Sequence, residues 1–160
     1  MNKQQLLKQL QDRLQQKIDA TLNAVNEAHA LASHEQSKPE NQYDTLALEA
    51  AYLAHGQSER IAELQNQMIL LNHFEFVELS QESQIALGAL ICIEEIGSEP
   101  QWLWLLPVSG GEQLVFGDKK IRTITPEAPL AEKLIGQYLG DEVELNLGHK
   151  KKQFEVIELL

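Results

Sequence analysis

Apolar side chains in the first third of the chain recur at helical spacing. Between residues 4 and 33 they lie three or four positions apart, with polar residues between them and no Gly or Pro before Pro39: Leu7, Leu10, Leu14, Ile18, Leu22 and Val25. This spacing predicts a helix about 45 Å long, at 1.5 Å per residue.

A second apolar stripe predicts a second helix, which begins near Asp44 or Thr45 because either residue caps a first turn. The stripe continues as far as residue 71: Leu46, Ala50, Leu53, Ile61, Leu64, Met68 and Leu71. Gly56 separates its two halves, so we expect a local register shift or a weak point there.

The break between the two stripes is short and polar, Ser37-Lys38-Pro39-Glu40-Asn41. Two amphipathic helices joined in this way predict an antiparallel αα-hairpin, in which each helix buries its stripe against the other. The pattern alone leaves an oligomerising coiled coil open as the alternative. Carboxylates at the end of a hairpin favour a segment that reaches into another molecule.

After Asn72 the apolar period changes from helical to two. The segment from Ile85 to Ile93 is apolar on both faces, which predicts a central strand, and Gly110-Gly111 predicts a hairpin turn. Shorter patterns predict strands over 102–106, 114–116, 143–147 and 154–159 and a helix over 130–138. The expected fold is α+β, with a coiled-coil hairpin at residues 1–73 and a β-rich domain carrying one short helix at residues 74–160.

Charge divides along the same boundary. The net charge of the chain is -11; residues 1–73 hold six basic and nine acidic residues, and residues 74–160 hold seven and 15. This balance disfavours a protein that neutralises many phosphates and favours one that meets basic protein surfaces. The small basic cluster of Lys119, Lys120 and Arg122 fits a solvated hairpin better than an RNA site.

Several kinds of chemistry find no support in the sequence. Cys92 is the only cysteine and is expected to be a small buried hydrophobe, which leaves no disulfide framework or zinc knuckle. The five His residues lack the spacing of metal ligands, and the sequence has no nucleophile triad or nucleotide-binding fingerprint. Trp102 and Trp104 fit core packing. The N-terminal residues form an amphipathic pattern and no apolar run is long enough to span a membrane, so a cytoplasmic protein is expected.

The C-terminal half resembles a known signature. The stretch Ile124-Thr125-Pro126-Glu127-Ala128-Pro129-Leu130-Ala131-Glu132-Lys133-Leu134-Ile135-Gly136, then Gly140-Asp141-Glu142-Val143, is similar to the signature of the Gre transcript-cleavage factors, roughly I-S/T-x-x-S-P-L-x-x-x-L-L-G-x-x-x-G-D-x-V. Ala128 stands where that signature has Ser. Shorter similarities at Ser83–Ile93, Arg60–Leu64 and Glu40-Asn41 follow in the family's order, so the resemblance covers nearly the whole chain.

The resemblance implies a function as well as a fold. In the Gre family an FKBP-like domain docks on RNA polymerase, and the hairpin enters the secondary channel, where tip carboxylates help hold a catalytic magnesium ion. The polymerase then cleaves backtracked RNA, so the factor itself is not an enzyme. For this chain the resemblance implies RNA polymerase as partner, indirect contact with nascent RNA, magnesium shared with the polymerase as the only cofactor, and a monomer. Glu127, Ala128 and Pro129 match the docking segment.

The candidate tip carboxylates are Glu40 and Asp44. Aligning Glu40-Asn41 with the family tip D-x-S-E-N places Ser37 at the position of the Asp, with Lys38 adding a positive charge beside it. Glu35 or Asp44 substitutes for the missing carboxylate if the loop folds suitably. Without a functional role, Glu40 is an exposed loop carboxylate and Asp44 a helix cap. The sequence therefore leaves open a cleavage-competent tip and a tip that occupies the channel without supporting cleavage.

Two further functions stay open at this point. One is a non-cleaving secondary-channel regulator or inhibitor that resembles the nucleoside diphosphate kinase regulators, which generally have a shorter hairpin than the two helices predicted here. The other is a scaffold that dimerises through its helices and has no role at the polymerase.

Overall fold

The computed structural model describes residues 1–33, 45–148 and 150–160. Its elements are two long helices, α1 (Lys3–Ser33) and α2 (Thr45–Asn72), followed by a sheet and a short helix, α3 (Pro129–Leu134). The chain forms two compact units, Gln11–Ile69 and Met1–Leu10 with Leu70–Leu160. We call them the helical unit and the sheet unit. The expected α+β class is confirmed, while the domain boundary after residue 73 stays a prediction.

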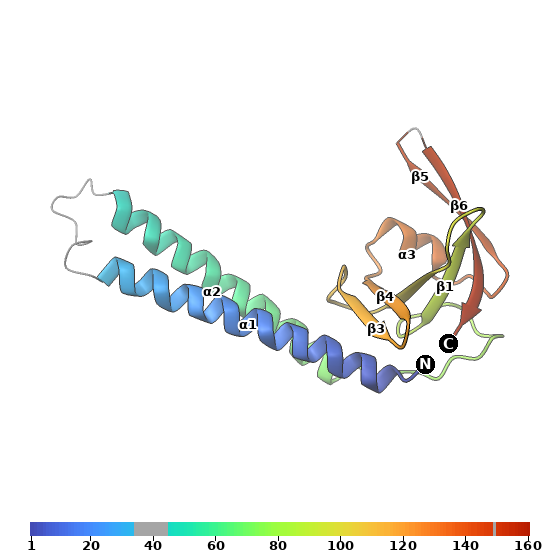
Figure 1. Cartoon of the computed structure of the whole chain (residues 1–160), viewed down its shortest axis with the longest axis horizontal. Helices are drawn as coiled ribbons and strands as arrows, with labels where there is room; N and C mark the ends of the chain where they lie inside the picture. Colours follow the sequence, from blue (N-terminus) through green and yellow to red (C-terminus); the bar gives the residue numbers. More distant parts are fainter. Residues whose placement is uncertain (34–44, 149) are drawn as a thin grey trace. The chain divides into compact units, whose positions relative to one another are not determined.

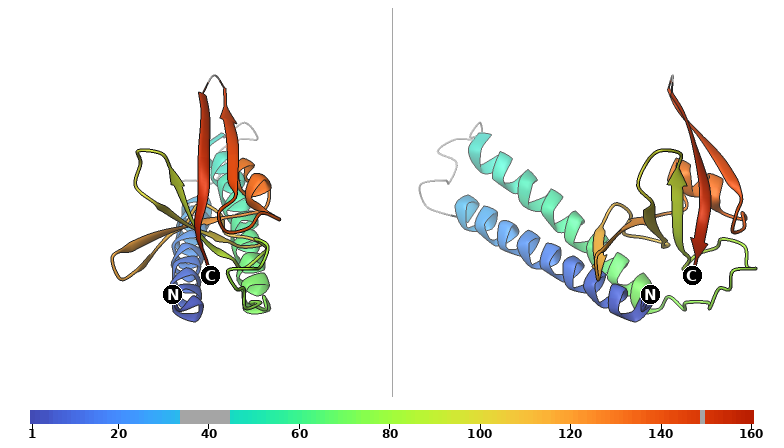
Figure 2. Two further views of the ribbon diagram at one scale, coloured as in Figure 1. Left: turned by 90° about the vertical axis from the view of Figure 1, so that its right-hand side faces the viewer. Right: turned by 45° about the vertical axis from the view of Figure 1, so that its right-hand side comes forward.

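Within the helical unit, α1 and α2 run antiparallel as a hairpin (Figures 1 and 2). The helix α1 begins after Asn2, whose side-chain oxygen accepts hydrogen bonds from the backbone N–H groups of Gln4 (3.0 Å) and Gln5 (3.2 Å). These bonds satisfy two of the donors that the first turn of a helix leaves free.

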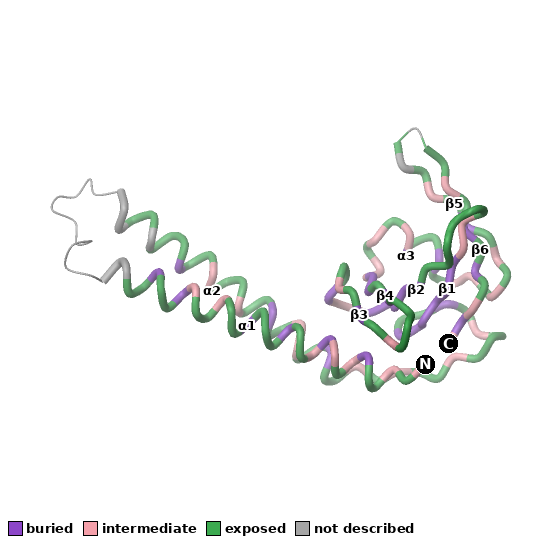
Figure 3. Tube along the Cα trace, in the orientation of Figure 1, coloured by how far each residue is buried: buried purple, intermediate pink, exposed green. Residues whose placement is uncertain are grey.

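The buried stripe of each helix differs in part from the predicted one. In α1, Leu10, Leu14, Ile18 and Val25 are buried as expected, but Leu22 is 40% exposed and Ala28 takes a buried position instead. In α2, Leu64 and Leu71 are buried, whereas Leu53 is 58% exposed and its neighbour Ala54 is buried. The small side chains of Ala28 and Ala54 take the buried positions, while the large side chains of Leu22 and Leu53 are exposed. A stripe of large apolar residues therefore predicts poorly which residues are buried in this part of the hairpin (Figure 3).

The helix α2 continues through Gly56 as a single element, so the helix does not break there, and the expected register shift or weak point stays a prediction. Gly56 is exposed, and a Cβ added to it would meet no atom within 4 Å. The backbone flexibility of Gly56 therefore destabilises the helix, and no packing contact requires a glycine at this position.

Replacing Gly56 by alanine is expected to stabilise the helical unit by about 0.5–1 kcal/mol, because alanine loses less backbone entropy in a helix. Thermal unfolding followed by circular dichroism at the helical band measures the change. The reverse substitution at an exposed position of the same helix, Ala62→Gly, should destabilise by a similar amount. A Gly56→Ala variant that unfolds at the same temperature as the parent would contradict this account of the site.

The sheet has six strands in the order β3-β4-β2-β1-β6-β5. Their bounds are β1 (Leu90–Glu95), β2 (Gln101–Leu105), β3 (Gln113–Phe116), β4 (Lys119–Ile124), β5 (Glu142–Leu147) and β6 (Lys150–Leu159). All neighbours pair antiparallel except β2 and β4, which are parallel.

Three predicted elements of this region need correction. Residues Ile85–Ala89 are not a strand, because the backbone turns at Gly88, whose φ of 90° would strain any other residue; a Cβ added there would lie 3.4 Å from the Phe74 and Phe76 rings. The turn at Gly110-Gly111 does not join a hairpin, since β3 pairs with β4 and not with β2. The helix α3 ends at Leu134, and the Gly136 N–H bonds instead to the Ile85 carbonyl at 2.8 Å.

The two faces of the sheet are buried in different ways. On one face α3 covers an apolar cluster through Ala131 and Leu134, which pack with strand residues such as Leu103, Leu105 and Ile124. On the other face Trp104 is fully buried and stacks on Phe76, with ring centroids 5.5 Å apart. Trp102 is 6% exposed and lies beneath the Lys119 ammonium, so the expected core role of both tryptophans is confirmed.

The open edge of the sheet at β3 is covered by a side chain of α1 that belongs to the same unit. The Gln9 amide nitrogen donates to the Val115 carbonyl at 2.8 Å, and the Val115 N–H donates to the Gln9 side-chain oxygen at 3.1 Å. One carboxamide thus pairs with both backbone groups of an edge-strand residue, as a neighbouring strand would, and blocks further strand addition at that point.

Replacing Gln9 by alanine is expected to cost about 1 kcal/mol and to speed hydrogen exchange at the Val115 amide roughly tenfold, because that N–H loses its partner. Exchange measured by nuclear magnetic resonance reports this amide directly. Gln5→Ala, on an exposed position of the same helix, is the control and should leave exchange at Val115 unchanged. Equal exchange rates in all three proteins would contradict the proposed pairing.

Among the described residues, no helix is long and apolar enough to cross a membrane. The same residues contain no group of three or more His, Cys, Asp or Glu side chains placed to hold a metal ion.

Candidate functional site

The sequence pointed to two regions, the hairpin tip and the segment Glu127-Ala128-Pro129. Glu40 and Asp44 lie outside the described residues, as do Glu35 and Ser37. The geometry of the tip carboxylates therefore stays a prediction, and the site that the structure describes is the second one.

The segment at Glu127 is a tight turn between β4 and α3. The Ala128 N–H bonds to the Thr125 carbonyl at 3.0 Å, which closes a four-residue turn with Pro126 at its second position, where proline is favoured. Hydrogen bonds from its own backbone N–H and from the Thr125 side chain hold the pKa of the exposed Glu127 carboxyl below its usual value. The turn therefore presents a carboxylate that is ionised at neutral pH.

The helix α3 starts directly after this turn. Ala128 is the N-cap residue in extended conformation (φ -70°, ψ 133°), with no side-chain cap, and Pro129 occupies the first turn, where its missing N–H costs nothing. The Ala128 carbonyl accepts the Glu132 N–H at 3.0 Å. The backbone is thus prepared for a capping hydroxyl that Ala128 does not supply.

Replacing Ala128 by serine is expected to stabilise the sheet unit by about 0.5–1 kcal/mol, because the hydroxyl would accept one of the free N–H groups of α3. Both tryptophans of the chain lie in β2, so urea unfolding followed by tryptophan fluorescence reports this unit. Ala86→Ser, at an exposed position outside the helices and strands, is the matched control with an effect within about 0.5 kcal/mol. Equal midpoints for the two variants would argue against the missing cap.

Beside this segment the sheet face that carries α3 opens into a cleft of about 580 Å³. Ala128 and Pro129 line one side of it, and Leu103, Ile124, Leu130 and Leu145 supply apolar lining. The structure thus brings two of the three predicted docking residues, Ala128 and Pro129, to the edge of an apolar cleft, and Glu127 precedes them on the exposed turn.

The loop at Gly110-Gly111 also lines the cleft, and it is fixed to β4 through Thr123. The fully buried Thr123 hydroxyl donates to the Ser109 carbonyl at 2.5 Å and accepts the Glu112 N–H at 2.9 Å. The Gly111 N–H bonds to the Thr123 carbonyl at 2.8 Å. A wall held by three such bonds gives the cleft a preformed shape.

Sequence reasoning missed most of this cleft. Leu103 and Arg122 are paired across the parallel strands β2 and β4, a contact that no local pattern indicates. The alternation of apolar and polar residues along β4 was the available signal, but the segment was interpreted as a solvated hairpin in preference to an RNA site. It is indeed the second strand of the β3–β4 hairpin, with Lys119, Lys120 and Arg122 exposed.

A comparison with known proteins identifies the family. The chain is 31% identical over 120 residues to the transcription elongation factor GreA of Syntrophus aciditrophicus (strain SB), and the match covers 75% of this chain and 69% of the relative. The chain belongs to the Gre family of transcription elongation factors. As a Gre-family member it is an accessory transcription factor and not itself an enzyme.

Solved structures of Gre proteins are similar to this Gre-family chain at lower identity. The GreA factor homolog 1 (Gfh1) protein of Thermus thermophilus is 20% identical over 94% of both chains, with a TM-score of 0.38. The GreA/GreB factor from Nitrosomonas europaea is 19% identical, over 60% of this chain and 78% of that one, with a TM-score of 0.37. No protein-family model matches the chain.

Proposed function

We propose that this Gre-family chain binds bacterial RNA polymerase in the cytoplasm through the cleft beside Glu127, Ala128 and Pro129. The hairpin then enters the secondary channel and modulates elongation or cleavage of backtracked RNA. The observation that carries the proposal is the 31% identity to a GreA elongation factor over most of both chains. In this proposal the sheet unit has the FKBP-like fold that the sequence resemblance implies.

The dimensions of the hairpin support the proposal. The helix α1 has 31 residues and α2 has 28. At 1.5 Å per residue these helices are about 45 Å and 40 Å long, which suits a probe that must reach a buried active site. Nucleoside diphosphate kinase regulators generally have a shorter hairpin, so these lengths favour the Gre-like function.

The proposed chemistry belongs to the polymerase, and the hairpin tip contributes oxygen ligands. Phosphoryl transfer by two metal ions needs a second magnesium, which prefers carboxylate and water oxygens. Glu40 would supply one such oxygen, and Glu35 or Asp44 is the candidate for a second. No cofactor is proposed to stay on the free chain, and contact with nascent RNA is indirect.

A second function, a secondary-channel factor that does not support cleavage, is favoured by one observation. When Glu40-Asn41 is aligned with the family tip, Ser37 falls where the family has Asp, and Lys38 follows it in the sequence with a positive charge. A tip with one carboxylate holds a shared magnesium weakly, so such a factor would compete for the channel and inhibit.

Co-purification with RNA polymerase from the organism that encodes the chain tests the proposal. One monomer bound per polymerase is expected, and sedimentation of the free chain should give a monomer. A stable coiled-coil dimer that does not bind polymerase would support the scaffold alternative and refute the proposal. Cleavage assays on stalled elongation complexes then separate the cleaving from the non-cleaving factor.

A further inference from the structure

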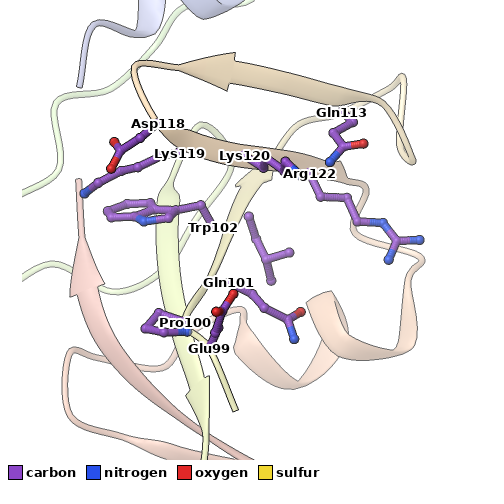
Figure 4. A pocket seen from close by; sticks show the side chains of 10 residues that line it. Glu99, Pro100, Gln101, Trp102, Gln113, Asp118, Lys119, Lys120 and Arg122 are labelled. Atoms are coloured by element: carbon purple, nitrogen blue, oxygen red, sulfur yellow. The ribbon is translucent and has the colours of Figure 1, made fainter.

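The apolar cleft beside α3 continues into a second cleft of about 440 Å³, seen in Figure 4. Gln101, Leu103 and Arg122 line both clefts, so the two form one groove along β2 and β4. Because side chains alternate along a strand, Lys120 and Arg122 leave β4 on the same face as Ile124, which packs in the core under α3. The groove therefore has an apolar floor beside α3 and cations where α3 no longer covers the sheet.

Arg122 differs from two other cations of the sheet unit that are held in ion pairs. Lys151 and Lys152 are paired with Glu144 and Glu95 at 3.0 and 2.7 Å. By contrast, the Arg122 side chain makes no hydrogen bond or ion pair with any described residue, although residues 74–160 hold 15 acidic side chains against seven basic ones. The guanidinium N–H groups of Arg122, which pair with no described residue, are therefore available to a carboxylate of a partner.

The other charged side chains of the groove do not neutralise Arg122. Lys119 lies over the Trp102 ring, 4.5 Å from its centroid, and Asp118 is beside Lys119. Figure 4 shows this group on one side of the pocket and Arg122 with Gln113 on the other. Glu99, the second acidic residue that lines the pocket, precedes β2 and makes no ion pair with Arg122.

We infer that the groove binds an apolar segment of RNA polymerase and that Arg122 pairs with a carboxylate side chain of that segment. This inference rests on the proposed function and adds the chemistry of the partner to it. The apolar side chains of the segment contact the half-buried Leu130 and Leu145, above the buried Leu103 and Ile124. The acidic side chain of the segment faces the Arg122 guanidinium. Glu127, at the α3 end, repels an acidic group there, so the charges fix the direction in which the segment binds.

Charge reversal at Arg122 tests the inference against a matched control. Arg122→Glu and Lys150→Glu change the net charge equally, and both residues are exposed, but Lys150 lies in the β5–β6 hairpin and does not line the groove. Binding to the intact polymerase is measured by titration of labelled chain at two salt concentrations. Arg122→Glu should raise Kd roughly tenfold or more, with a smaller loss for Arg122→Gln, and Lys150→Glu should stay within about twofold.

The outcomes are distinguishable. If Arg122→Glu and Lys150→Glu bind equally well, the inference is wrong and the proposed function stands. If the unmodified chain does not bind polymerase, both are wrong. If Arg122→Glu instead reduces affinity for single-stranded RNA while polymerase binding is unchanged, the groove is an RNA site and the inference is overturned. Urea unfolding followed by tryptophan fluorescence, with Arg122→Gln as the milder variant, confirms that a loss of binding is not a loss of folding.

Discussion

Replacing Trp104 by alanine is expected to lower the free energy of unfolding of the sheet unit by about 3–5 kcal/mol, enough to unfold a marginally stable domain. The side chain is fully buried. Its ring stacks on Phe76, and the indole N–H donates to the Gly88 carbonyl at 3.3 Å. Alanine would leave a large cavity and an unpaired carbonyl beside it.

Urea unfolding followed by the fluorescence of the remaining Trp102 measures this loss. Trp104→Phe keeps a ring against Phe76 but removes the indole donor, so it should cost less, about 1–2 kcal/mol. Tyr52→Ala removes an aromatic ring that is 69% exposed and should change stability by less than about 0.5 kcal/mol. A Trp104→Ala protein as stable as the Tyr52→Ala control would refute the assignment of Trp104 to the core.

Under the proposed function, Ser37→Asp should speed RNA cleavage in stalled elongation complexes by about tenfold or more. The substitution supplies the carboxylate that the family tip has at this position, and losing even an outer-shell partner of a metal ligand typically costs on the order of 10- to 100-fold. The rate is measured as shortening of labelled RNA at limiting magnesium, where a second ligand has the largest effect.

Two controls separate this effect from a general change at the tip. Ser37→Asn has nearly the same shape without the charge and should leave the rate close to that of the parent. Glu40→Ala should abolish any cleavage that the parent or the Ser37→Asp variant supports, and full activity in Glu40→Ala would refute the tip assignment. No gain for Ser37→Asp, with polymerase binding intact, would show that this loop does not place residue 37 at the metal.

The sequence predicted the elements whose pattern is local. The two long helices and the strands at 102–106 and 143–147 match observed elements closely, because a periodic apolar stripe reports directly on one buried face. The strand predicted over 154–159 is the C-terminal part of β6, which begins at Lys150. The strand predicted over Ile85–Ile93 was half wrong, since Ile85 and Ala89 are buried beside a turn at Gly88 and not within a ladder. An apolar pattern on both faces predicts that a segment is buried, but it does not distinguish a strand of the sheet from a buried turn.

The candidate site was predicted only where a motif marked it. The segment Glu127-Ala128-Pro129 was found through its resemblance to the Gre signature, and the structure places Ala128 and Pro129 at the edge of a cleft. Arg122 was noted only as part of a basic cluster, and its place beside Leu103 at the cleft was not predicted, because parallel pairing of β2 with β4 brings together residues far apart in sequence. Such pairing depends on the whole sheet and not on the local pattern.

Site-specific cross-linking from the hairpin tip to polymerase tests the central claim most directly. Cys92 is buried, and burial raises the pKa of its thiol to about 11, so a cysteine introduced by Ser37→Cys reacts selectively with a thiol-reactive photo-cross-linker. In a stalled elongation complex this position should cross-link to the active-site region of the catalytic subunit, while the same probe at Lys150→Cys should not. Polymerase that is bound but cross-linked from residue 37 only on its outer surface would contradict insertion of the hairpin into the channel.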